Sequence, residues 1–577
     1  MGEQKNLFIA LGLSLVVMFL FDTFYMKPKL EEQQRQYDEL MATHESEAPT
    51  LSADTIPQAV AEVEQVVALT VDNAIGQVPR IAIETPELFG SISLKGLRFD
   101  DLSLIKHFDT MDKDTRTNIR LFEPTGTEHA YYAQFGWAGV GKGEGFLPTY
   151  SSIWSADRDM LTPSTPVTFS WNNDQGFTFQ TKIAVDEQFM FTITQSVINA
   201  SNNDVILAPY GYVNRKSIPN VQALYILHEG PIGVFDGILE EKTYADIEDD
   251  GSFSASSTGG WLGITDKYWM AIMVPDQASH IQKATFSRKT NTGISHKVDY
   301  IEDGSTVAAG STVSNVTRLY AGAKIVGSID AYEDQYNIPL FNRTVDWGMF
   351  HFITRPMFKA LEWLFNMVGN FGVAILLLTV LVKAILFPIA NKGYRSMSRM
   401  KKVGPRIKEL QKTHADDKVK LQQEMMALYK AEKINPLSGC LPMLVQIPIF
   451  FSLYKVLYVT IDMRHQPFFG WITDLSAPDP MTPFNLFGLI PWDPPSMIAI
   501  GIWPIMMGLT MWLQQKLNPS AGMDPTQAKV MSMLPIIFTF ILAQFSAGLV
   551  IYWTWNSALS IAQQWVIMRR EGVSVND

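Results

Sequence analysis

The chain has 577 residues, enough for several domains, and 47% of them are hydrophobic. Its single cysteine, Cys440, excludes an intrachain disulfide, so any large exported domain must be stabilised by its own core. The net charge of −12 is unevenly distributed, because residues 391–433 carry 12 Lys and Arg against 5 Asp and Glu.

The chain begins with a predicted membrane anchor. Residues 7–26 are almost entirely apolar, and bulky residues, not a small-residue cleavage site, end the segment at Phe24–Met26. We therefore interpret residues 1–26 as an uncleaved transmembrane anchor that exports the next part of the chain. Residues 27–85 are acidic, rich in Gln and Ala and short of aromatics, which predicts a partly helical or disordered tether.

Residues 86–340 have the pattern of a large all-β domain. Short runs alternate apolar and polar residues, for example TFSWNN (168–173), FTFQTKIAV (177–185) and FMFTITQSVI (189–198). The sequence NDQG at 173–176 predicts a turn between the first two runs. Many such runs with Gly, Asn and Asp breaks predict an antiparallel β-sandwich.

From residue 341 onward the sequence predicts membrane-associated helices. Residues 341–366 are aromatic and amphipathic, with Pro356 in the middle, which is typical of a helix that lies in the membrane interface. The apolar runs long enough to cross a bilayer lie at about 368–390, 437–459, 497–515, 530–546 and 548–567. With the N-terminal anchor they make six predicted transmembrane helices.

The charges of the connections predict the orientation. The basic segment 391–433 should be cytoplasmic by the positive-inside rule, whereas 461–496, with one Arg and four Asp, should face outside. The basic connection 516–529 and the tail 569–577 fit the cytoplasmic side. Both termini are then cytoplasmic and the β domain lies outside.

Within 391–433, apolar residues at helical spacing on either side of THADD (413–417) predict a helical hairpin. One interpretation is a solvated determinant of topology. The other is a surface that docks a ribosome, a targeting factor or a nascent chain. Its candidate residues are Arg406, Lys408, Lys412, Lys418, Lys420 and Met425.

Lys383 is the only charge in the apolar run 368–390, and Thr379, four residues earlier, shares its helix face. A lysine at hydrocarbon depth marks a functional site by default. Two interpretations remain open: the lysine snorkels to the interface, or it lines a polar cavity. Other apolar helices carry isolated polar residues, namely Gln446, Gln544, Tyr552, Thr554, Asn556 and Gln563.

The sequence contains no convincing enzyme motif, and we expect no cofactor and no metal. HExxH, GxSxG and CxxC are absent, and GWAGVGKG (136–143) has Gly143 where a phosphate-binding loop needs Ser or Thr. His465 is a lone histidine, which we interpret as structural. We expect no sequence-specific binding of nucleic acid.

Three long motifs resemble the YidC family of membrane protein insertases. They are MMALYKAEKINPLSGCLPMLVQIPIFFSLYKVL (425–457), RHQPFFGWITDLSAPDP (464–480) and FSAGLVIYWTWNSALSIAQQW (545–565). The resemblance covers roughly 345–570. By layout, the remainder is similar to the Gram-negative form, whose periplasmic domain is a β-super-sandwich akin to sugar mutarotases. The resemblance implies a multi-pass inner-membrane protein with a five-helix insertase core.

The resemblance also implies a mechanism. The core encloses a hydrophilic groove that is open to cytoplasm and lipid and closed to the outside, and a basic residue there attracts the acidic tail of a nascent membrane protein. Lys383 matches the basic position, and the implied polar or aromatic wall comprises Thr379, Gln446, Tyr552, Trp553 and Asn556. The implied partners are the Sec translocon, the ribosome, signal-recognition targeting components and membrane lipids.

This chain differs from the family pattern at the basic position, where the family commonly has arginine and this chain has lysine. A lysine lacks the bidentate fork of arginine, which predicts a looser and more transient attraction for carboxylates. Two alternative functions stay open at this point. One is a secondary transporter or channel, and the other is a membrane-anchored periplasmic sugar-binding or isomerase module.

Overall fold

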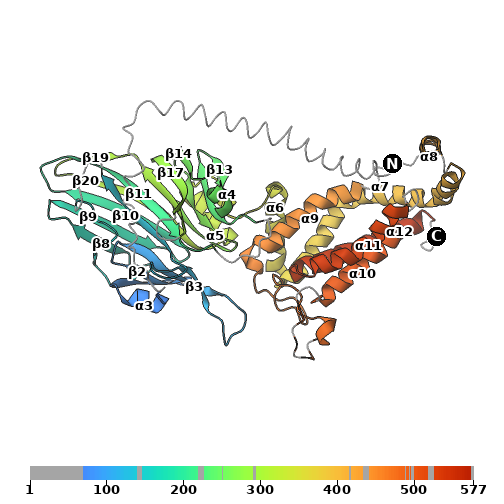
Figure 1. Cartoon of the computed structure of the whole chain (residues 1–577), viewed down its shortest axis with the longest axis horizontal. Coiled ribbons are helices and arrows are strands. Elements are labelled where there is room, and N and C mark those ends of the chain that lie inside the picture. The colour runs from blue at the N-terminus through green and yellow to red at the C-terminus, as the bar shows by residue number, and fades with distance from the viewer. Residues whose placement is uncertain are drawn as a thin grey trace. The chain divides into compact units, whose positions relative to one another are not determined.

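The computed structural model describes residues 69–139, 146–218, 227–249, 251–289, 294–414, 417–432, 441–487, 489–490, 492, 494–495, 499–517 and 525–572. Cys440, the predicted anchor and most of the predicted tether lie outside these residues. The described chain divides into two compact units, one ending at Asp346 and the other beginning at Trp347. We describe each unit by itself (Figure 1).

The first unit is a sandwich of two large, almost entirely antiparallel sheets (Figure 1). The eleven-stranded sheet has the order β14 (Phe253–Thr258), β17 (His280–Lys289), β18 (Ser295–Glu302), β11 (Val205–Arg215), β5 (Tyr131–Gly139), β3 (Arg98–Phe108), β2 (Leu88–Ser93), β1 (Arg80–Glu84) and β7 (Met160–Leu161), with β19 (Ser305–Val307) beside β11 and β4 (Asn118–Phe122) beside β3. The nine-stranded sheet has the order β13 (Ile238–Glu241), β12 (Gly230–Phe235), β15 (Trp261–Thr265), β16 (Trp269–Val274), β20 (Thr312–Ala323), β10 (Met190–Asn199), β9 (Phe177–Val185), β8 (Val167–Asn172) and β6 (Ser155–Ala156).

The core of this unit lies between the two sheets. Phe99 on β3 and Phe191 on β10 meet across it with ring centroids 5.4 Å apart, and both are buried. Burial alternates along β9, as expected of a strand with one face on the core. In the described part of this unit, three short helices accompany the sheets: α3 (Val71–Gly76), α4 (Tyr244–Asp249) and α5 (Val326–Tyr336).

The predicted turn at 173–176 is confirmed. β8 and β9 pair in antiparallel register, and Asp174 and Gly176 between them have φ of 56° and 87°. The domain starts earlier than the sequence predicted, because β1 lies inside the segment 27–85 and pairs with β2 over five positions. The short apolar alternation of β1 is too brief to separate from tether by pattern alone.

The second unit is helical. The first unit ends shortly after a 3₁₀ helix at Phe341–Thr344. The second unit contains α6 (His351–Val368), α7 (Phe371–Thr413), α8 (Lys418–Ala431), α9 (Leu441–Val459), α10 (Ile502–Leu517), α11 (Pro525–Leu542) and α12 (Ala547–Arg570). α6 is the predicted amphipathic helix, although it starts at His351 and not at 341. Among the described residues, α7 alone is long and apolar enough to cross a membrane, and two shorter apolar stretches lie in α9 and α11. The number of six transmembrane helices therefore stays a prediction.

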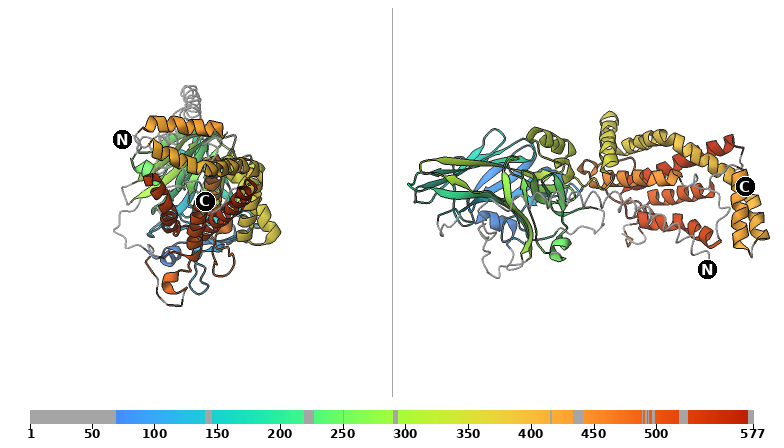
Figure 2. Two further views of the ribbon diagram at one scale, coloured as in Figure 1. Left: turned by 90° about the vertical axis from the view of Figure 1, so that its right-hand side faces the viewer. Right: turned by 90° about the horizontal axis from the view of Figure 1, so that it is seen from above.

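α7 corrects one predicted boundary. The sequence separated a span ending at 390 from a cytoplasmic hairpin, but the helix continues without interruption to Thr413. It continues because Val403 and Ile407, four residues apart, are buried against Tyr429 of α8. The end of α7 and the whole of α8 form the two legs of the hairpin (Figures 1 and 2).

Candidate functional site

The polar residues predicted in the apolar helices come together around α12. Lys383 on α7 is half-buried, and its Nζ donates a hydrogen bond of 2.7 Å to Ser560 Oγ on α12. The Ser560 hydroxyl in turn donates to the backbone oxygen of Asn556 at 2.8 Å. The ammonium is therefore held by a neutral hydroxyl that is itself fixed to its helix.

A second polar pair joins α9 to the same helix. Gln446 Nε2 donates to the hydroxyl oxygen of Tyr552 at 2.9 Å, and Tyr552 is buried. Tyr552, Asn556 and Ser560 are four residues apart, so they share one face of α12. Sequence reasoning missed Ser560, although its spacing from the two predicted residues would have found it.

Thr379 lies beside these residues, but its hydroxyl forms a hydrogen bond within its own helix. Its Oγ1 donates to the backbone oxygen of Ile375 at 2.7 Å, as buried threonines in helices often do. Thr379, Tyr552 and Asn556 line a narrow cavity with apolar residues of α6, α7 and α9. The lining is completed by Met357, Leu378, Val382, Ile449 and Leu453.

Trp553 does not join this polar group. Its ring lies 4.5 Å from that of Phe450 on α9 and 6.0 Å from that of Phe538 on α11. It packs against the apolar cluster of Met507, Leu542 and Val550. Adjacent residues of a helix point about 100° apart, so Trp553 takes the apolar side of α12 while Tyr552 takes the polar side.

The hairpin places its predicted docking residues in two different settings. Arg406, Lys408, Lys412 and Lys420 are exposed, and Arg406 Nη1 pairs with Glu432 at 3.0 Å. The side chain of Lys418 lies outside the described residues. Met425 packs against the core between α7 and α8 and is only half-exposed, and its role in docking stays a prediction.

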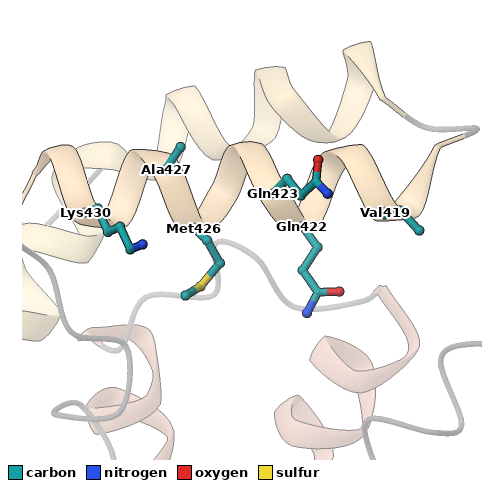
Figure 3. A pocket seen from close by; sticks show the side chains of 6 residues that line it. All are labelled: Val419, Gln422, Gln423, Met426, Ala427 and Lys430. Atoms are coloured by element: carbon teal, nitrogen blue, oxygen red, sulfur yellow. The ribbon is translucent and has the colours of Figure 1, made fainter.

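Met426, not Met425, is the exposed methionine of α8. With Val419, Gln422, Gln423, Ala427 and Lys430 it lines a shallow pocket, and Gln422 and Met426 point to the same side of the helix (Figure 3). The period of 3.6 residues gives Met425 and Met426 opposite roles, and sequence alone could not decide which faced the partner leg.

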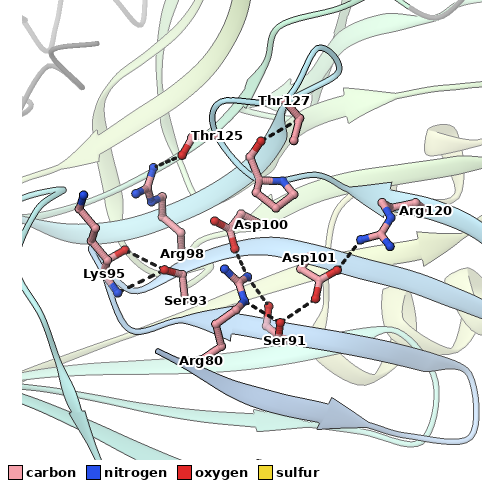
Figure 4. Close-up of polar contacts among 11 residues, drawn as sticks. Arg80, Ser91, Ser93, Lys95, Arg98, Asp100, Asp101, Arg120, Thr125 and Thr127 are labelled. Carbon is pink, nitrogen blue, oxygen red and sulfur yellow. Dashed lines mark hydrogen bonds and ion pairs between the residues drawn. The ribbon is translucent and has the colours of Figure 1, made fainter. Parts of the chain in front are cut away.

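The β domain contains a polar cluster that is paired within itself (Figure 4). Arg80 forms an ion pair with Asp100, and Arg120 Nη1 lies 2.6 Å from Asp101 Oδ1. Burial raises the pKa of Asp100 above its ordinary value, although the neighbouring Arg80 opposes this. Ser91 Oγ donates to Asp101 at 2.6 Å, so the cluster ties strands β1 to β4 together.

Comparisons with known proteins match both units. Residues 80–360 match the family model "YidC periplasmic domain" and residues 363–573 match "60Kd inner membrane protein". Membrane protein insertases YidC from Nitrobacter hamburgensis and Rhizobium etli are 48% and 47% identical to the chain, cover all of it, and are matched over 96% and 97% of their own lengths.

The chain belongs to the YidC family of membrane protein insertases. It is therefore an inner-membrane protein with a β-rich periplasmic domain, and it is an insertase and not an enzyme.

Solved structures resemble this YidC-family chain more distantly. An active YidC insertase crystal structure with its first transmembrane domain resolved is 16% identical, covers 84% of this chain and 91% of its own, and has a TM-score of 0.33. A galactose mutarotase related enzyme from Lactobacillus acidophilus is 10% identical, covers 43% of this chain and all of its own, and has a TM-score of 0.28. Scores this low add nothing to the assignment.

Proposed function

We propose that Lys383 is the element of this insertase that attracts the acidic tails of nascent membrane proteins, from a hydrophilic groove that faces the cytoplasm. The observation that carries the proposal is the partner of the lysine. Its hydrogen bond goes to the neutral Ser560, and among the described residues no carboxylate pairs with Lys383. Its positive charge therefore remains available to a substrate carboxylate.

The same geometry suits release as well as capture. A single ammonium binds a carboxylate through a point charge and not through a planar fork, so the pair is loose. After the tail has crossed, Ser560 can take back the hydrogen bond, which restores the site. The apolar surfaces of α9 and α11 then provide a path to lipid for the hydrophobic segment.

We place the protein in the membrane with six helices, both termini in the cytoplasm and the hairpin on the cytoplasmic side. Exposed basic residues of the hairpin support this orientation. On that side, Arg406, Lys408, Lys412, Lys418 and Lys420 offer a docking surface for the ribosome and signal-recognition targeting components. Cooperation with the Sec translocon and contacts with membrane lipids belong to the same proposal.

The alternative of a secondary transporter or channel has less support. Such proteins build their sites from interrupted helices. Here α7, α9 and α11 each contain an internal proline, at Pro388, Pro448 and Pro535, and each helix runs through it. The alternative of a sugar-binding module would rest on the mutarotase likeness, whose TM-score of 0.28 is too low to argue from.

The test compares Lys383→Ala, Lys383→Arg and Lys383→Glu in proteoliposomes with two substrates that differ only in tail charge. One substrate carries Asp residues in its outer tail and the other carries Asn at the same positions, and protease protection of the tail measures insertion. We expect Lys383→Arg to insert both substrates, Lys383→Ala to lose about tenfold on the acidic tail only, and Lys383→Glu to lose more. Normal insertion of the acidic tail by Lys383→Ala would contradict the proposal.

A further inference from the structure

One loop meets the first residues of three helices. We call residues 466–482, which come after α9, the capping loop. The first four N–H groups of any helix lack partners within the helix, so a buried helix start must find acceptors elsewhere. α7, α10 and α12 all begin against this loop, and it supplies acceptors for two of them.

At α12 the acceptors are backbone oxygens of the loop. Ala547 N donates to the Ala477 oxygen at 2.7 Å, and Gly548 N donates to the Leu475 oxygen at 2.9 Å. A Cβ atom at Gly548 would lie 3.2 Å from that same oxygen, so glycine allows the close approach. The loop is therefore seated directly on the helix end.

At α7 the contact is steric and polar. The Asn370 side chain caps the helix by accepting from Val373 N at 3.0 Å, and its Nδ2 donates to the Phe468 oxygen at 3.3 Å. The ring of Phe468 occupies the space beside Gly372, where an added Cβ would come within 2.0 Å of it. The first turn of α7 thus fits this loop only with glycine at that position.

At α10 the contact depends on a carboxylate. Ile502 N donates to the Met481 oxygen at 3.0 Å, and Trp503 N donates to Asp479 Oδ2 at 2.8 Å. The other oxygen of Asp479 accepts from Met481 N at 3.0 Å and from the indole N–H of Trp471 at 2.9 Å. Among the described residues, no Lys or Arg pairs with Asp479, which is only 6% exposed. Its charge is stabilised by N–H groups and by the positive end of the helix.

The loop is also closed within itself. Asp474 Oδ1 accepts from His465 N, Ser476 N and Ser476 Oγ at 3.1, 2.8 and 2.7 Å, which shapes the turn before the cap. His465 contributes its backbone N–H to this turn, so the structural role predicted for its side chain stays a prediction. The side chain of Leu475 at the centre of the loop is 0% exposed.

The family resemblance implies a groove that is closed to the outside, and we propose that Asp479 is the residue that positions the capping loop as the seal of this closed end. This rests on the proposed orientation, in which the first residues of α7, α10 and α12 face the periplasm. Lys383 lies roughly 18 Å along α7 from the seal, so water reaches it from the cytoplasmic end alone. With the outer end closed, water can enter the groove from the cytoplasm without forming a continuous aqueous path across the membrane.

The sole cysteine makes the test direct, because Cys440→Ser yields a chain free of cysteine. Leu475→Cys then reports on the buried side of the loop, and Phe469→Cys, at a position 62% exposed, is the accessible reference. A membrane-impermeant maleimide is added to the periplasmic side of cells carrying the full-length protein. Each reporter is measured with Asp479, with Asp479→Asn, and with Glu362→Gln as a control that removes an exposed carboxylate from α6.

Asp479→Asn keeps the shape of the side chain but replaces one of its two acceptor oxygens with an NH₂ group. That group would face at least one of the three N–H donors that Asp479 now accepts from, so a hydrogen bond is lost. We expect Leu475→Cys to react slowly beside Asp479 and about tenfold faster beside Asp479→Asn, with no change beside Glu362→Gln. Proteoliposomes of Asp479→Asn should also leak a small dye. The thermal unfolding midpoint, measured in parallel, separates loop opening from general unfolding.

Two results would overturn the proposal. One is a Leu475→Cys chain that reacts as fast as Phe469→Cys although Asp479 is present. The other is a folded Asp479→Asn chain with unchanged labelling and no leak. This test can succeed even if the Lys383 test fails. Normal insertion of the acidic tail by Lys383→Ala would refute the proposed groove function. Fast labelling of Leu475→Cys beside Asp479→Asn would still support the seal.

Discussion

The substitution Ser560→Asp should disable the site by capturing Lys383 within the protein. Ser560 Oγ already accepts a hydrogen bond of 2.7 Å from Lys383 Nζ. The carboxylate oxygens of an aspartate lie one bond farther from the helix than a serine hydroxyl, and the flexible lysine stem can retreat to accommodate them. The result is an internal ion pair at the place where a substrate carboxylate would bind.

The strength of that pair sets the size of the effect. Two unit charges about 4 Å apart attract by about 4 kcal/mol at an effective dielectric constant of about 20, whereas exposed pairs yield roughly 0.2–1 kcal/mol. Because Ser560 is buried and Lys383 is half-buried, we take the range of a hydrogen bond to a charged group, roughly 1.5–3 kcal/mol. Insertion of acidic tails should then fall about 10- to 100-fold.

The assay uses the same pair of substrates, with Asp or Asn in the outer tail, and Ser560→Asn is the matched control. Asn has the shape of Asp without its charge, so it reports the cost of the larger side chain alone. We expect Ser560→Asp to impair the acidic tail selectively and Ser560→Asn to affect both substrates equally and weakly. Equal losses in the two variants, or equal losses on the two tails, would refute the electrostatic reasoning.

Three further predictions concern the two units separately. Gly322→Ala should destabilise the β domain by about 2–3 kcal/mol, because the new Cβ would lie 2.1 Å from the fully buried ring of Phe189. Urea unfolding followed by limited proteolysis measures this loss. Gly327→Ala is the control and should be tolerated, because no atom lies within 4 Å of the Cβ that it adds. Burial raises the pKa of Glu302 from 4.5 to about 7, so the folded domain holds this proton more tightly than the unfolded chain and loses stability as pH rises across that window. Glu302→Gln should remove the loss, worth up to about 3 kcal/mol at about pH 8, and an unchanged pH profile of unfolding would contradict this. Tyr429→Ala should loosen the hairpin, which faster hydrogen exchange in α8 would reveal and unchanged exchange would refute.

Much of the fold can be predicted from local pattern. The β domain is predictable because apolar and polar residues alternate along short segments such as β8 and β9, and turn residues separate these segments. The positions of helices α9 to α12 are predictable within a few residues, because each helix contains a long apolar run. Boundaries fail where the pattern is weak: β1 is short, and α7 passes from an apolar to a charged composition without a change of backbone geometry.

The candidate site is only half visible in the sequence. Lys383 is conspicuous because it is a charge inside an apolar run, and Thr379, Gln446, Tyr552 and Asn556 because they are polar residues in apolar helices. The roles predicted for Trp553 and Met425 stay predictions, because the sequence does not show which neighbouring side chains pack against each face of a helix.

From the residues alone we could predict which segments avoid water, a cytoplasmic preference of the basic hairpin, and a lysine at membrane depth. The group that this lysine contacts, and the loop that supplies acceptors to the starts of α10 and α12, became evident only in the folded chain. Lys383 and its partner are 177 residues apart, and Asp479 meets α10 across a loop. A hydrogen bond acts over about 3 Å, so it depends on distances in space that periodicity along the chain does not encode.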